Sequence, residues 1–203
     1  SGALGLADAL GASFVQEVIA ASRYLKHRAP DLDAAIELGG EDAKLLYLSN
    51  GVELRMNEAC AGGTGAFIDQ MASLLDVDAA GLNKLASEAQ ISHPMASRCG
   101  VFAKTDLVAL LNGGVPKSEV ARSVLDAVAE QTVSGLACGR PVRGKIAFLG
   151  GPLTFLSELR AAFERRLSST GTTFASFCDA HCAVAIGAAL EGMDPASRAH
   201  RSR

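Results

Sequence analysis

The chain has 203 residues, of which 49% are hydrophobic, so it can bury a core of its own without disulfides or structural metals. Its 19 basic residues against 22 acidic ones give a net charge of −3, which disfavours nucleic acid as a partner. The apolar run from Cys182 to Leu190 is far shorter than the roughly 20 residues of a membrane span, and no signal-peptide pattern opens the chain, so a cytoplasmic protein with no membrane partner is expected.

The first elements predicted are three short strands joined by tight turns. Apolar residues predict strands at 34–38, 45–48 and 52–56, with Gly39-Gly40 and Asn50-Gly51 between them. This order is typical of a β-meander.

Helices and further strands are expected after the meander. Apolar periodicity predicts helices at 64–76, 79–89, 103–112 and 117–137, then a buried strand at 145–149, a helix at 153–168, a β-like segment at 172–177 and a helix at 181–191. This mixture predicts an α/β fold with a short mixed sheet.

Two Gly-Gly turns directly follow predicted strands, at Gly39-Gly40 and at Gly150-Gly151. Glycine after a strand lets a phosphate approach the backbone closely, and acidic neighbours such as Glu41 and Asp42 can hold Mg²⁺ through water. Each turn alone is weak evidence, because Gly-Gly at a bend is usually only a bend. No Walker-type or GxGxxG motif is present, so the common routes to nucleotide binding are absent.

Two of the five cysteines, Cys60 and Cys99, each stand a few residues before a predicted helix. The free N–H groups and positive dipole end of a helix favour a thiolate over a neutral thiol. Two cysteines in the same setting indicate a shared anionic ligand, and a metal or iron–sulfur centre is the natural candidate. The alternative is that both are small residues at helix caps.

The order of these motifs resembles the activator ATPases of 2-hydroxyacyl-CoA dehydratases and benzoyl-CoA reductases. The resemblance rests on Glu37-Leu38-Gly39-Gly40-Glu41-Asp42-Ala43-Lys44, Met56-Asn57, Cys60-Ala61-Gly62-Gly63-Thr64-Gly65, Cys99-Gly100-Val101-Phe102-Ala103, Phe148-Leu149-Gly150-Gly151 and Ala185-Ile186-Gly187-Ala188-Ala189-Leu190. These motifs cover almost the whole chain from about Ala34 onward, and the cysteine motifs are the most specific part.

The resemblance implies an actin-like (ribonuclease H-like) ATPase fold and one [4Fe–4S] cluster shared by two copies of the domain, in a homodimer or a tandem repeat. Cys60 and Cys99 of each copy would ligate the cluster. In the family the cluster makes a low-potential electron available to a 2-hydroxyacyl-CoA dehydratase component, the implied partner. We expect the two sulfurs to lie close together on one surface.

The resemblance also implies binding of ATP or ADP with Mg²⁺. Glu37 and Glu41 take the catalytic positions. The residues implied for nucleotide and Mg²⁺ are Gly39, Gly40, Asp42, Gly63, Thr64, Gly65, Gly150, Gly151 and Pro152. The two Gly-Gly turns are expected to face one cleft.

The chain departs from the family in two respects. Nothing before Ala34 resembles the first phosphate-binding loop, which predicts that the chain is a fragment that alone binds ATP poorly and hydrolyses it negligibly. Residues 1–33 are then the end of the first subdomain with a connector, 34–192 the helix-rich second subdomain, and 193–203 a polar tail. Glu37 and Glu41 replace the Asp and Gln usual in small activators. This variant resembles the one in long multidomain dehydratase-activase proteins, and it puts the hydrolytic geometry in doubt more than nucleotide binding.

Two other functions stay open at this level. A small-molecule kinase of the same fold would need a catalytic Asp and no cluster, and a non-catalytic repeat would pair with an active copy and have negligible nucleotide affinity.

Several other residues have simpler interpretations. The segment Cys178-Asp179-Ala180-His181-Cys182 offers only three of the four ligands of a closed zinc site, so small buried thiols at a strand-to-helix junction are favoured. Cys138 is predicted to be a core residue, His93 a loop histidine, and Arg98 and Lys104 either cluster-facing or solvated.

Overall fold

The computed structural model describes residues 2–49, 51–57, 62–96, 100–169 and 171–194. By its internal contacts the chain divides into two compact units. One comprises the described residues up to Leu32 and from His181 onward, and the other is Asp33–Ala180. The division into functional subdomains at 33/34 and 192/193 stays a prediction.

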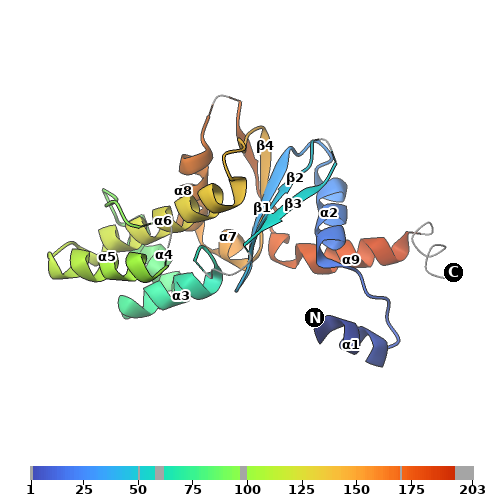
Figure 1. Ribbon diagram of the computed structural model, residues 1–203, viewed down its shortest axis with the longest axis horizontal. Coiled ribbons are helices and arrows are strands. Elements are labelled where there is room, and N and C mark those ends of the chain that lie inside the picture. The colour runs from blue at the N-terminus through green and yellow to red at the C-terminus, as the bar shows by residue number, and fades with distance from the viewer. Residues whose placement is uncertain (1, 50, 58–61, 97–99, 170, 195–203) are drawn as a thin grey trace. The chain divides into compact units, whose positions relative to one another are not determined.

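The larger unit is built on a five-stranded mixed sheet of order β3-β2-β1-β4-β5 (Figure 1). Its strands are β1 (Ala34–Leu38), β2 (Ala43–Tyr47), β3 (Glu53–Met56), β4 (Lys145–Leu149) and β5 (Thr173–Ala175). The first three strands are antiparallel neighbours, whereas β1 with β4 and β4 with β5 are parallel pairs. The predicted meander and mixed sheet are therefore confirmed.

The helices of this unit supply most of its core. They are α3 (Gly65–Leu74), α4 (Ala79–Ser87), α5 (Gly100–Asn112), α6 (Lys117–Ala137), α7 (Gly151–Phe155) and α8 (Ser157–Leu167). Figure 1 shows α3, α4 and α5 extending away from the sheet with α6 alongside them. The long helix α6 buries a row of small and branched apolar residues and packs against α4, α5 and α8, so it is the central support of the unit.

The continuous helix predicted at 153–168 is wrong, because the chain breaks at Leu156 between α7 and α8. Leu156 has an extended backbone with φ −100° and ψ 95°, and it is only 7% exposed. Its N–H still bonds to Pro152 O at 3.0 Å, which ends α7. Here the free energy gained by burying the Leu156 side chain exceeds the cost of interrupting the helix.

The smaller unit contains α1 (Gly2–Ala9) and α2 (Glu17–Arg28), where no element was predicted, and α9 (Ala183–Met193) after a short 3₁₀ turn. Helices α2 and α9 pack closely, since a Cβ added to Gly187 would lie 1.8 Å from Ala20 O. Arg23 adds an ion pair to Asp194 Oδ2 at 2.6 Å. The sequence does contain features that favour a helix at α2. An acidic residue, Glu17, lies in its first turn and basic residues lie in its last turn, where each interacts favourably with the helix dipole.

The prediction that Cys138 is a core residue is wrong, since Cys138 is exposed at the end of α6. It takes the left-handed conformation, with φ 47°, that ends helices, and its thiol lies 3.1 Å from Gly135 O. Cys178 and Cys182 are exposed as well, so the prediction that these two thiols are buried is also wrong.

None of the helices in the described part of the chain is both long and apolar enough to cross a bilayer.

Candidate functional site

The turn between β1 and β2 carries the acidic Gly-Gly motif. Gly39 N–H donates to Asp42 O at 2.8 Å and closes the turn. Lys44, opposite Glu37 in the strand register, lies 2.6 Å from Asp42 Oδ2 and 3.8 Å from Glu37 Oε2. The side chains of Lys44 and Glu37 are only 3% and 9% exposed, so a buried charge cluster underlies the turn.

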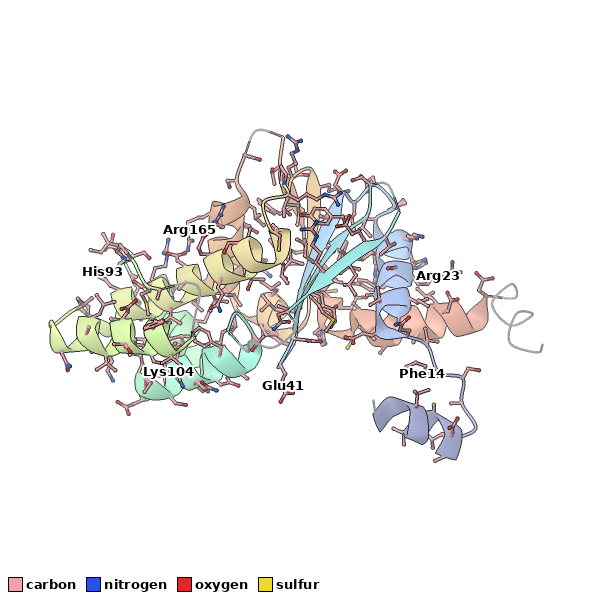
Figure 2. All side chains as sticks on the ribbon, viewed as in Figure 1. Phe14, Arg23, Glu41, His93, Lys104 and Arg165 are labelled. Atoms are coloured by element: carbon pink, nitrogen blue, oxygen red, sulfur yellow. The ribbon has the colours of Figure 1, made fainter. Side chains whose placement is uncertain are left out.

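Glu41 has a different environment from Glu37, although the two were predicted as a catalytic pair. Glu41 is exposed at the outer end of the turn, where Figure 2 labels it beyond the end of the sheet. Glu37 is buried within β1 beside Lys44. Only Glu41 is therefore directly available to a ligand in this structure.

The start of α3 rests on the same turn. Gly65 N–H donates to Gly39 O at 3.0 Å, and Ala66 N–H donates to Gly40 O at 2.7 Å. These are first-turn amides of a helix, which have no partners within the helix itself. The Gly-Gly turn and α3 are consequently joined by backbone hydrogen bonds.

The residues directly before α3 are hydrogen-bonded to α6. Gly63 has φ +82°, and its carbonyl accepts a hydrogen bond from buried Thr132 Oγ1 at 3.3 Å. Thr64 is fully buried and caps the helix with an extended backbone. The predicted nucleotide residues Gly63 and Thr64 thus lie beneath the turn in the packing with α6.

The second Gly-Gly turn follows β4 directly. Gly150 has φ +89°, and a Cβ added there would lie 2.0 Å from Leu38 O, so only glycine fits. Gly150 N–H donates to Ala180 O at 3.2 Å. Because β1 and β4 are parallel neighbours, the two glycine turns lie at the same edge of the sheet.

Both turns line one pocket of about 470 Å³. The residues lining it are Gly40, Glu41, Gly65, Ala66, Ile68, Asp69, Ala79, Gly151, Pro152, Phe155 and Leu156. Of the residues predicted from sequence, Gly40, Glu41, Gly65, Gly151 and Pro152 are among them. Glu37, Gly39, Asp42, Gly63, Thr64 and Gly150 are not among the lining residues.

Sequence reasoning missed the rest of this pocket. Asp69 lies one helical turn after Gly65, and Phe155 and Leu156 closely follow Pro152, so spacing alone could have indicated them. Ala79, at the start of α4, has no such relation in sequence to the predicted residues, and only the tertiary fold places it in the pocket lining.

Cys60 and Cys99 lie outside the described residues, and so does Arg98. The neighbouring residues are described: α3 begins five residues after Cys60, and α5 begins directly after Cys99. A Cβ added to Gly100 would lie 3.1 Å from the ring of Phe67, in the first turn of α3. The two helices that follow the cysteines therefore touch at their starts.

The described segment after α4, residues 88–96, is hydrogen-bonded to α6 and α5. His93 N–H donates to Ser123 Oγ at 2.7 Å, and its ring Nε2 lies 2.8 Å from Glu119 Oε2 on α6. Ala96 N–H donates to Asp106 Oδ2 on α5 at 2.7 Å. The loop position predicted for His93 is confirmed. Lys104 is half-buried on α5, and its predicted role stays open.

Among the described residues, no group of three or more His, Cys, Asp or Glu side chains is arranged to hold a metal ion, the Cys178–Cys182 segment included.

A model of the BadF/BadG/BcrA/BcrD ATPase family matches residues 14–192. The chain belongs to this ATPase family. Its relatives in the family include the (R)-2-hydroxyglutaryl-CoA dehydratase activating ATPase of Acidaminococcus fermentans, 30% identical over 70% of this chain and 50% of that protein. The 2-hydroxyisocaproyl-CoA dehydratase activator of Clostridioides difficile is 30% identical over 68% of this chain and 52% of that protein. The chain thus spans about half the length of these two relatives.

The fold of this family member matches solved activator structures. The activator of the 2-hydroxyisocaproyl-CoA dehydratase from Clostridium difficile with bound ADPNP superposes with a TM-score of 0.80 at 27% identity, over 93% of this chain and 70% of that chain. The predicted α/β, actin-like ATPase fold is confirmed.

Proposed function

We propose that the chain acts in an ATP-dependent activator that delivers a low-potential electron to a 2-hydroxyacyl-CoA dehydratase or a related CoA-thioester reductase. Family membership and the names of the relatives support this function. The observation that carries it is that α3, which follows the Cys60 segment, hydrogen-bonds to a glycine turn of the pocket.

The pocket would bind the nucleotide with Mg²⁺. Cβ atoms added to Gly40 and Gly151 meet nothing within 4 Å, so the backbone of both turns is open to a phosphate. Glu41 and Asp69 line the same pocket and are suited to hold hydrated Mg²⁺. Lys44 would keep Glu37 and Asp42 in place behind the turn.

Cys60 and Cys99, with their counterparts in a second copy, would hold a [4Fe–4S] cluster. Four thiolates complete the ligation of such a cluster, which supplies one-electron transfer at low potential when bound. The contact between Gly100 and Phe67 supports this assignment, because it joins the helices that start after the two cysteines. The N-terminus of α5 would favour the thiolate of Cys99.

The hydrogen bonds from Gly65 and Ala66 to the Gly39-Gly40 carbonyls would couple the two sites. A nucleotide that shifts this turn shifts the start of α3 with it. The segment that contains Cys60 leads directly into that start.

The test is anaerobic reconstitution of the chain with iron and sulfide. We expect wild-type protein to bind about four irons per dimer, because each copy supplies two of four cluster ligands. Cys60→Ala and Cys99→Ala should each lose this iron and the brown colour while their far-ultraviolet circular dichroism is unchanged.

Cys138→Ala is the matched control, since Cys138 is an exposed thiol distant in sequence from both motifs. It should retain the full iron and sulfide content. Equal iron content in wild type and both site variants would contradict the proposed cluster.

A further inference from the structure

The pocket contains an exposed aromatic side chain at its edge. Phe155, the last residue of α7, is 66% exposed and lines the pocket between the glycine turns. A single exposed apolar residue is ordinary on a protein surface. A Phe with most of its surface accessible beside phosphate-binding glycine turns indicates a contact with a ligand.

The local structure fixes Phe155 in this position. Leu153 and Leu156, on either side of it, are 1% and 7% exposed, so both are anchored in the core. Thr154 Oγ1 donates to Gly150 O at 2.7 Å, and Arg160 Nη1 donates to Leu153 O at 3.3 Å. The backbone on both sides of Phe155 is thus held, which lowers the entropy cost of a contact made by its ring.

The lining of the pocket combines two kinds of surface. One kind consists of glycine backbone and the acidic side chains Glu41 and Asp69. The other is apolar and comes from Ile68, Ala79, Pro152, Phe155 and Leu156. A ligand that fits both kinds carries a phosphate chain and a flat apolar ring, as a nucleotide does.

We propose that Phe155 is the base-contacting residue of this pocket and stacks against the ring of a purine nucleotide. This inference rests on the proposed nucleotide site. It assigns to Phe155 the preference of that site for a nucleotide over a polyphosphate without a base. Stacking on an aromatic face depends on ring area and little on ring substituents. Phe155 therefore favours purines over pyrimidines and contributes equally to ATP and GTP.

The experiment measures the affinity of the full chain for MgATP and for magnesium tripolyphosphate by NMR titration. Phe155→Ala should weaken MgATP binding about tenfold, the usual order for loss of one base–aromatic stack, and leave tripolyphosphate binding unchanged. Phe155→Tyr should restore the affinity for MgATP. Phe102→Ala is the matched control, since Phe102 is 65% exposed on α5 and does not line the pocket.

A spectroscopic signature separates stacking from apolar contact. Stacking moves the adenine H2 and H8 resonances upfield in wild type and in Phe155→Tyr, and this shift should be lost in Phe155→Leu, which keeps an apolar side chain without a ring.

Unchanged MgATP affinity in Phe155→Ala, or an equal loss for tripolyphosphate, would overturn the base contact and leave the proposed nucleotide site standing. Absence of MgATP and tripolyphosphate binding in wild type would overturn both.

Discussion

Lys44 lies between two carboxylates beneath the β1–β2 turn, and the three side chains form a small charge cluster. Its amino group is close to Asp42 and Glu37, and its side chain is almost fully buried. A buried charge is costly unless it is paired, so each member of the cluster depends on the others. The strand register brings Lys44 opposite Glu37.

Lys44→Met keeps the volume of the side chain and removes its charge. We expect the free energy of unfolding to fall by about 3 kcal/mol, because Glu37 is left buried without its cation. Urea unfolding followed by circular dichroism measures this change. Adding Glu37→Gln should recover part of the loss, since the double variant has no uncompensated buried charge at this position.

Lys84→Met is the control for Lys44→Met, because Lys84 is exposed on α4. Its stability should equal that of wild type. A loss of the same size in both lysine variants would contradict the role given to the buried cluster.

Among the secondary-structure elements, the contact between α3 and the β1–β2 turn joins the proposed nucleotide site to the Cys60 segment. It is a backbone-to-backbone contact, and it leaves little room for a side chain at Gly65. A Cβ on Gly65 would lie 3.2 Å from both Gly39 O and Gly40 Cα. Neither atom belongs to a side chain that could turn away.

Gly65→Ala should therefore displace the turn from α3. We expect the free energy of unfolding to fall by about 1–2 kcal/mol, as for other overpacked positions. Hydrogen exchange measured by mass spectrometry should show faster exchange in residues 39–42 and 65–66.

Gly135→Ala is the matched substitution in α6, where an added Cβ meets nothing within 4 Å. It should stabilise the protein by about 0.5–1 kcal/mol, because glycine is a poor helix residue. Equal stability of the two variants would contradict the tight contact at Gly65.

The chain divides into two compact units, and the smaller one combines two segments that are distant in sequence. The smaller unit depends on the packing of α2 against α9. In that packing Gly187 faces Ala20 O, and a Cβ added to Gly187 would lie 1.8 Å from that oxygen, so no side chain fits. Gly187 is therefore the residue that permits this helix pair.

Gly187→Ala should force α2 and α9 apart. We expect a loss of about 3 kcal/mol in local stability, at the upper end for overpacking, because the added methyl group would collide with backbone. Hydrogen exchange should accelerate in residues 17–28 and 183–193 and stay slow in α6. Gly192→Ala, where an added Cβ meets nothing within 4 Å, should leave exchange unchanged. Accelerated exchange in α6 as well would show that the two units unfold together.

Local elements and the order of the motifs could be predicted from the amino-acid sequence alone. Short apolar runs predict β1 and β4, and apolar residues at helical spacing predict α6, because these patterns follow from strand and helix geometry. The glycine pairs and the two cysteine motifs are short and contiguous in the chain, so they indicate the family without any knowledge of the packing.

Which of the predicted residues face a ligand depends on the tertiary fold. Glu37 and Glu41 stand four positions apart in one motif, yet the sheet buries the first and exposes the second. Asp69, Ala79 and Phe155 line the same pocket although they lie on three different helices. Cys138 is exposed because α6 ends at the residue before it. The physical reason is that burial and contact depend on which elements pack together, and no local pattern in this chain specifies that packing.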